Sequence, residues 1–258
     1  MHSKALQKSK LIMDTINASE SGALSLENIH ILTQIPKPTV KRLLDDLQDL
    51  GVVYRKLKDK QYVVLYSRGQ DDNDKYLLAR ELSPILTQLH KETSMYSDIV
   101  YLHRGAPVIL ESNFSYSNIR SAAERIMDIR FSPLLSAAGR ALYSENNIYH
   151  RSQQGYSGLN FEQLAAEKAC GIYQRIPGSW EHPFPPPFPL AAIALPIRFK
   201  QKTVAAINLY WSTQLPPSSQ IPPFKLTALH NARNTLEKML QQESVCRKTL
   251  PQLLQQEW

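Results

Sequence analysis

The sequence predicts an α+β protein with an N-terminal winged helix-turn-helix, a linker helix and a larger C-terminal α/β sheet domain. Three observations lead to this prediction. The first 66 residues contain two short helical patterns around a Pro-rich turn, followed by two β-rich stretches. A stretch without apolar residues, 67–74, then interrupts the pattern. Beyond it, short strands alternate with helical segments, which is typical of helices packed against a sheet.

The helix-turn-helix is predicted from its capping and turn residues. Ser25 is a good N-cap for the first helix. Both Ile35 and Lys37 precede a proline, which disfavours helical backbone, so we expect the second helix to begin no earlier than Pro38. Gly51 predicts the end of that helix, because glycine readily takes the left-handed conformation that closes a helix.

The second helix has two contrasting faces. The face that we expect to be buried carries Val40, Leu43, Leu44 and Leu47. The outward face is cationic in its first half, with Lys37, Thr39, Lys41 and Arg42, and acidic in its second half, with Asp45, Asp46 and Asp49. Because acidic side chains repel phosphate, we expect the N-terminal half to enter a DNA groove. The alternative is a protein-binding winged helix whose lysines are only solvated.

A wing and a preceding helix complete the predicted head. Residues 52–55 and 61–65 predict two strands, and the basic tip 56–60 lies between them. Residues 6–16 have apolar side chains at helical spacing and predict a further helix that precedes the helix-turn-helix. The basic excess per residue is larger in the first 70 residues than in the rest of the chain, which suits a phosphate-binding surface.

Composition limits the class of protein. The chain has 258 residues, 43% hydrophobic and 21% charged, with a net charge of +7 and a pI near 9.3. These values exclude extensive disorder and favour an anionic partner. No apolar stretch approaches ~20 residues and no signal segment is recognisable, so we expect a cytoplasmic protein without membrane contact. Cys170 and Cys246 have no metal-ligand spacing, and we expect both to be packing residues.

The C-terminal elements follow from hydrophobic period and breaker residues. The domain boundaries are expected at 1–68 for the head, 69–83 for the linker helix and 84–258 for the sheet domain. Pro84 predicts that the helix at 76–90 ends or kinks there. The remaining predicted elements are a hairpin of 97–102 and 107–112, a third strand at 119–123, helices at 134–143 and 161–173, strands at 190–199 and 204–211, and a final helix at 221–246.

A proline run, 181–189, can be neither helix nor central strand. It predicts a rigid surface connection. The alternative is a lid over a ligand cavity, with Phe184 and Phe188 as its apolar lining.

Four segments occur in the order found in one known family: Ile35–Leu44, Leu47–Val52, Phe131–Tyr143, and Ala192–Ile197 followed by Ala205–Leu209. Through them the chain resembles the IclR-type bacterial transcriptional regulators over nearly its whole length. The resemblance implies a winged helix that reads operator DNA and a C-terminal domain that binds a small organic acid. It also implies a homodimer or a dimer of dimers on palindromic double-stranded operators.

The resemblance implies a set of DNA-binding residues. They are Lys37, Pro38, Thr39, Lys41 and Arg42 on the second helix, with Lys58 and Lys60 of the wing on phosphate. Arg42 is the first candidate for a base contact, because bidentate arginine on guanine is the commonest specific contact. The alternative is that Arg42 binds phosphate only.

The resemblance also implies an effector cleft between the helix that starts near Ser136 and the sheet. Its residues would be Arg120, Arg130, Phe131, Ala137, Ala138, His182, Leu190, Ala192, Asn208 and Tyr210. Small residues at a helix start let a carboxylate approach free N–H groups. The two arginines would add charge, or else form surface salt bridges, and Asn208 could instead satisfy local backbone. The aromatic lining favours an aromatic or longer carboxylic acid.

The sequence departs from the family pattern at Gln34, Pro38 and Pro133, which bears on the operator sequence and the rim of the cleft. The predicted function is regulation of a catabolic operon by an aromatic carboxylic acid, with no cofactor, no metal and no enzymatic activity. The chain has no nucleophile elbow, HExxH, dinucleotide-binding glycines or P-loop. The alternative is an enzyme or a protein-interaction scaffold with an accessory winged helix.

Overall fold

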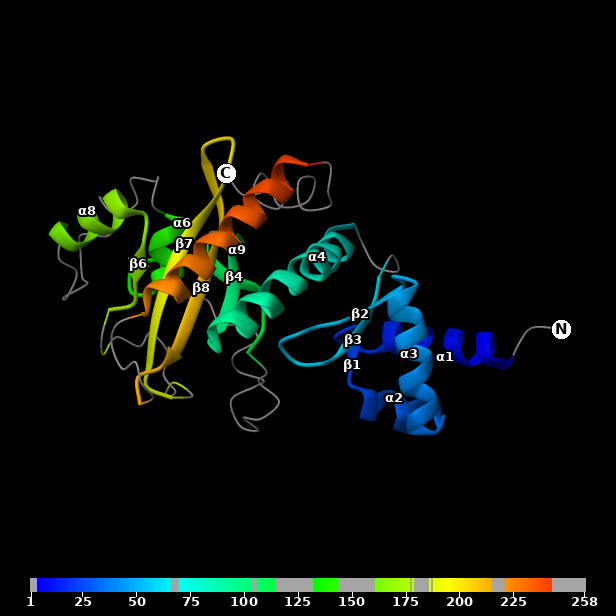
Figure 1. The fold of residues 1–258 in the computed structure, drawn as a ribbon. Coiled ribbons are helices and arrows are strands. Elements are labelled where there is room, and N and C mark those ends of the chain that lie inside the picture. The colour runs from blue at the N-terminus through cyan, green and yellow to red at the C-terminus, as the bar shows by residue number, and fades with distance from the viewer. Residues whose placement is uncertain are drawn as a thin grey trace.

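The structure is a computed structural model, and two bodies joined by the long helix α4 make up its fold (Figure 1). The first body is a small N-terminal head, and the second is a C-terminal sheet domain. The described residues are 4–65, 70–103, 106–114, 132–143, 161–176, 178, 186, 188–214 and 221–242.

The head is a three-helix bundle with a small antiparallel sheet, as the sequence predicts for a winged helix. Its helices are α1 (Lys4–Ala18), α2 (Leu26–Thr33) and α3 (Lys37–Asp49). Its strands, in the spatial order β1-β3-β2, are β1 (Ala23–Leu24), β2 (Val53–Arg55) and β3 (Tyr62–Val64). The predicted apolar face of α3 is buried against α1 and α2, so the opposite face of α3 points outward.

The helix ends largely follow the predicted capping residues. The Ser25 hydroxyl accepts the Asn28 N–H at the start of α2. Gln34 ends α2 in the left-handed conformation with φ of 57°. The prediction that α3 begins no earlier than Pro38 is wrong by one residue, because α3 begins at Lys37. Lys37 takes helical backbone although the residue before a proline usually avoids it. Pro38 itself fits the first turn, because the N–H that proline lacks would have no intrahelical partner there.

The end of α3 closes as Gly51 predicts. Gly51 has φ of +70°, and the Val52 N–H donates to the Leu47 carbonyl at 2.9 Å. A hydrogen bond that spans six residues in this way is typical of a helix that ends at a left-handed residue. It turns the chain directly into β2 and thereby places the wing beside α3.

The helix α4 (Gln70–Thr93) is continuous through Pro84. Of the two outcomes predicted for Pro84, an end or a kink, the end is therefore wrong, and the kink remains a prediction. Proline removes one backbone donor, but its neighbours bind nearby carbonyls. The Ser83 hydroxyl donates to the Ala79 carbonyl at 2.7 Å, and the Thr87 hydroxyl donates to the Ser83 carbonyl at 2.8 Å. A helix held on both sides by tertiary packing tolerates the lost bond.

Two cores share α4. Ala79 packs against Tyr54 and Val63 of the head. The apolar series Leu78, Leu82, Leu86 and Leu89 is buried in the core of the sheet domain. The helix therefore joins the two bodies by packing and not only by chain connection.

The sheet domain is built on one antiparallel sheet with the strand order β5-β4-β8-β7-β6. Its strands are β4 (Tyr96–His103), β5 (Ala106–Ser112), β6 (Tyr173–Gln174), β7 (Leu190–Phe199) and β8 (Lys202–Ser212). The predicted hairpin and the predicted strand pair are confirmed. The predicted third strand at 119–123 lies outside the described residues.

Helices cover the two faces of this sheet. The helices α4 and α9 (Pro223–Gln241) pack on one face through Ile99, Ile207 and Leu209. The small helix α6 (Ala137–Leu142) packs on the other face, where Val100, Ala194 and Ala206 are buried. Figure 1 shows α9 crossing β7 and β8, with α8 (Phe161–Cys170) beyond β6.

One helix boundary and the role of one cysteine differ from the sequence predictions. The helix predicted over 161–173 stops at Cys170, because Gly171 with φ of +70° reverses the chain into β6. Cys170 is exposed and is not the packing residue that we expected. Cys246 lies outside the described residues. No helix of the described ranges combines the length and the apolar character needed to cross a membrane.

Candidate functional site

The outward face of α3 is the first candidate site. Lys37, Pro38, Lys41 and Arg42 are all exposed, and Thr39 is half-buried beside them. Figure 1 places α3 on the side of the head away from the sheet domain. The first two turns of this helix therefore present a cationic surface to solvent.

The cations on this face differ in their partners. Lys37 forms an ion pair with Glu27 of α2, and its hydrogen bond lowers the pKa of that carboxyl. Lys41 pairs with Asp45 one turn later. Among the described residues, Arg42 has no ion-pair partner. Exposed pairs of this kind are worth little, so phosphate can replace Glu27 and Asp45 at small cost.

The wing has a contact that the sequence did not predict. The Tyr54 hydroxyl, on β2, donates a hydrogen bond to the Glu111 carboxylate of β5 and lies 2.5 Å from the Ser83 hydroxyl of α4. The Leu57 N–H at the wing tip also points to Glu111, at 3.5 Å. Tyr54 and Glu111 are both buried. The wing therefore packs against the edge strand of the sheet domain.

The contact shifts the pKa values of Glu111 and of the wing lysine Lys60. Burial raises the pKa of Glu111, while Lys58 of the wing tip stabilises its charged form. Burial and the nearby Arg55 lower the pKa of Lys60. Both predicted wing lysines are half-buried in this arrangement. Their contact with phosphate remains a prediction.

The second candidate site is the sheet face under α6. Ala137 and Ala138 are buried against Val100, Ala194 and Ala206. Leu190 and Ala192 lie on β7, and the β7–β8 register pairs Ala192 with Tyr210. The structure therefore brings together six of the predicted effector residues on α6, β7 and β8, namely Ala137, Ala138, Leu190, Ala192, Asn208 and Tyr210.

The remaining predicted effector residues cannot be placed. Arg120, Arg130, Phe131 and His182 lie outside the described residues, as do Phe184 and most of the proline run. Their roles remain predictions.

The start of α6 is capped by its own chain. The Ser136 hydroxyl accepts the Gly139 N–H at 2.9 Å and donates to the Ser132 carbonyl at 2.7 Å. One of the N–H groups that a carboxylate ligand would use is therefore already bonded. This weighs against the carboxylate position that small residues at this helix start predicted.

A buried polar cluster lies on the same sheet face, and the sequence analysis missed its central residue, Asp98. Asp98 of β4 accepts hydrogen bonds from Tyr210 at 3.2 Å and Asn208 at 3.4 Å, and the Ser112 side chain also binds it. Asp98 is 3% exposed, and burial raises its pKa to about 6. An Asp inside the otherwise apolar stretch after Ser97 was the available sequence signal.

Aromatic rings lie next to this cluster. Tyr96 stands 4.7 Å from Phe114 and 5.8 Å from Tyr210, measured between ring centroids. Phe188, the described phenylalanine of the proline run, lies 6.0 Å from Phe114. This placement agrees with the alternative in which Phe188 lines a ligand site.

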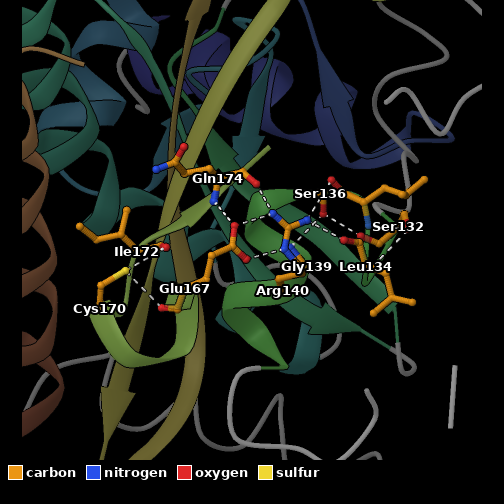
Figure 2. Close-up of polar contacts among 10 residues, drawn as sticks. Ser132, Leu134, Ser136, Gly139, Arg140, Glu167, Cys170, Ile172 and Gln174 are labelled. Atoms are coloured by element: carbon orange, nitrogen blue, oxygen red, sulfur yellow. Dashed lines mark hydrogen bonds and ion pairs between the residues drawn. The ribbon is translucent and has the colours of Figure 1, made fainter. Parts of the chain in front are cut away.

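A buried ion pair holds α6 in position, as Figure 2 shows. The Arg140 guanidinium donates to both carboxylate oxygens of Glu167 on α8, at 2.8 and 3.0 Å. It also donates to the carbonyls of Leu134 at 2.6 Å and of Gln174 on β6. Arg140 is fully buried. Its five donors thus join α6, α8 and the outer edge of the sheet.

No titratable group of the described residues forms a metal site, since no three His, Cys, Asp or Glu side chains there lie close enough to share an ion. No family model matches the chain.

Solved structures nevertheless resemble it in fold. An IclR homolog from Microbacterium sp. strain HM58-2 superposes with a TM-score of 0.51 at 15% identity, covering 94% of this chain and 100% of that one. An IclR homolog from Microbacterium hydrocarbonoxydans complexed with 4-hydroxybenzoate gives 0.49 at 17% identity, covering 92% and 99%. The Agobacterium tumefaciens repressor BlcR gives 0.46 at 18% identity, covering 93% and 98%. The chain therefore has the fold of the Microbacterium sp. HM58-2 IclR homolog, and the resemblance to IclR-type regulators is confirmed at the level of the fold.

Proposed function

We propose that this protein is a sequence-specific DNA-binding transcriptional regulator of the IclR type, and neither an enzyme nor a scaffold. The observation that carries this proposal is the exposed cationic first half of α3 on a winged-helix head. A helix of this kind places its N-terminal residues on base edges in the major groove. The shared fold with an IclR homolog supports the same assignment.

Arg42 is the residue that reads a base in this proposal. It is exposed, and among the described residues it has no ion pair to break. Lys37, Lys41 and Thr39 then position the helix on phosphate and neighbouring bases. Lys58 and Lys60 of the wing contact the phosphate backbone.

The sheet face under α6 is the effector site in this proposal. Ala192, Asn208 and Tyr210 converge there from two strands, and the aromatic rings beside them suit a ligand with a ring. Control of a catabolic operon by an aromatic carboxylic acid is the form that the sequence resemblance implies. The ring is supported by the aromatic cluster, whereas the charge of Asp98 opposes a carboxylate at that end of the site.

Assembly is part of the same proposal. A homodimer or a dimer of dimers presents two α3 helices to the two halves of a palindrome, since operator symmetry follows protein symmetry.

A mobility-shift titration with the DNA upstream of this protein's own coding region tests the proposal. We expect specific binding that weakens steeply with salt, because phosphate contacts release counterions. Arg42→Ala should cost about 1–3 kcal/mol. Asp14 is an exposed residue of α1, and Asp14→Ala is a control that leaves the α3 surface intact. Absence of binding at low ionic strength would contradict the proposal, and an unchanged Arg42 variant would remove Arg42 from the reading surface.

A further inference from the structure

We propose that the sheet face under α6 binds an organic ammonium ion, held by Asp98 and Asn208 beside the ring cluster of Tyr96, Phe114, Phe188 and Tyr210. We call this group of residues the ammonium site. The inference rests on the proposed function, in which this domain binds the effector, and it names the chemical class of that effector.

The first argument is an uncompensated buried carboxylate. Asp98 is 3% exposed, and its described partners are the neutral side chains of Ser112, Asn208 and Tyr210. Within the described ranges, no Lys, Arg or His lies at ion-pair distance from it. A buried charge without a counter-ion is costly. A cationic ligand would supply that counter-ion.

The second argument is an acceptor without a donor. The Asn208 Nδ2 group donates to Asp98, so its Oδ1 is the atom that faces elsewhere. This oxygen has no hydrogen-bond partner, and it is shielded from solvent because Asn208 is only 7% exposed. The single hydroxyl proton of Tyr210 is already donated to Asp98. The cluster therefore has acceptors to offer, and an N–H donor on the ligand would satisfy them.

The third argument is the aromatic cluster beside Asp98. The rings of Tyr96 and Phe114 each lie within 6.2 Å, by centroid, of one another and of the rings of Phe188 and Tyr210. The negative faces of aromatic rings attract cations, and several rings together with a carboxylate form the usual receptor for an alkylated ammonium group. Tyr96 and Phe188 are half-buried, so the ring group is reached from solvent.

A carboxylate fits this group of atoms poorly. It would meet the charge of Asp98 and the lone pairs of Asn208 Oδ1, which repel it. A ligand that bears both charges would have to point its carboxylate away from Asp98. The proposal thus changes the predicted effector from a simple organic acid to a molecule with a positive amino group.

Isothermal titration calorimetry on the full chain, at about pH 8, tests the proposal with three probes that share one ring. They are benzylammonium, benzyl alcohol and sodium benzoate. We expect benzylammonium to bind at least about tenfold more tightly than benzyl alcohol, because cation–π contacts and a buried charge pair act only on the cation. Benzoate should bind most weakly. Tighter binding of benzoate than of benzylammonium, or absence of benzylammonium binding, overturns the proposal.

Two variants place the effect on Asp98. Asp98→Asn keeps the shape and removes the charge, and it should weaken benzylammonium binding at least about tenfold. Glu237→Gln is the matched control, because Glu237 lies on α9 across the sheet, where it accepts the Arg198 N–H. Equal affinities in wild type and Asp98→Asn overturn the proposal. If Asp98→Asn does not fold, the three-probe comparison on the wild type decides alone.

Failure of this inference is separable from failure of the proposed function. Binding of the wild type to its upstream DNA is measured without any ligand. A protein that binds this DNA and prefers benzoate is a regulator with an acid effector, which contradicts the ammonium site only.

Discussion

The hydroxyl of Tyr54 on the wing strand donates a hydrogen bond to the buried carboxylate of Glu111 on the edge of the C-terminal sheet. The same hydroxyl meets Ser83 of α4, so one phenol joins the head, the linking helix and the sheet domain. Burial, reinforced by the charge of Glu111, raises the pKa of Tyr54 well above its usual value, so Tyr54 remains the donor at neutral pH.

The Tyr54–Glu111 contact should couple the two bodies energetically. Tyr54→Phe and Glu111→Gln should each lower the free energy of unfolding by about 1–3 kcal/mol, because each leaves a buried polar partner less well satisfied. The double variant should lose less than the sum of the two. Chemical denaturation of all four proteins measures this coupling. Strictly additive losses would show that the two groups do not interact in solution.

Asp98 should make stability depend on pH. Its folded-state pKa of about 6 exceeds the value of 3.8 expected for the unfolded chain, so the folded state binds the proton more tightly. Stability from this group is therefore largest below pH 3.8 and is lost as pH rises to about 6. At about pH 8 the ionised Asp98 should lower the free energy of unfolding by up to about 3 kcal/mol, at about 1.4 kcal/mol per pKa unit. Asp98→Asn should remove this loss.

The control for this pH profile concerns neighbouring groups. Glu111 also raises the pKa of Asp98 and is itself raised, so it adds a dependence of the same sign that persists in Asp98→Asn. Thermal melts from about pH 4 to 8 compare the proteins. An Asp98→Asn profile that parallels the wild type over this range would refute the assignment.

The Arg140–Glu167 pair should be sensitive to removal of one partner. Arg140→Met leaves the Glu167 carboxylate buried without its counter-ion, which should cost about 3–5 kcal/mol. Replacing both by Met should recover much of this loss, because no buried charge then remains. Lys168 is exposed on α8, next to Glu167, and Lys168→Met is the matched control. It should change stability by less than about 0.5 kcal/mol. A double variant as unstable as Arg140→Met would contradict this explanation.

Gly51→Ala should destabilise the head through backbone conformation. Its φ of +70° disfavours a side chain, and the expected cost is about 1–3 kcal/mol. A Cβ there would also lie 2.8 Å from Nη1 of Arg80, but this flexible side chain can move away. Arg80→Ala should therefore not rescue Gly51→Ala in a double-variant comparison of unfolding free energies. Full rescue would assign the cost to the clash instead.

Local patterns in the sequence were sufficient for the elements of the head. The stripe that begins at Val40 lies on one face of α3, and Ser25 and Gly51 act where their chemistry predicts. The strand pair β7 and β8 was equally recognisable. Such features depend on residues within one turn or one hairpin, so the sequence alone determines them.

Pro84 and Gly171 show where local reasoning was insufficient. The tendency of proline to end a helix is real, but α4 is buried against two cores, and that packing outweighs the lost hydrogen bond. The end of α8 at Cys170 was missed because the apolar pattern continues through Tyr173, which serves β6 instead.

The candidate sites divide in the same way. The chain alone determined the cationic half of α3 and the small residues of α6, since both are consecutive in one helix. Only the tertiary structure decided that Asp98 meets Asn208, that Glu111 meets Tyr54 and that Arg140 meets Glu167. These partners are distant in sequence, and strand register and helix packing bring them together. The energy of a buried charge depends on its neighbours in space, and a local sequence pattern does not identify them.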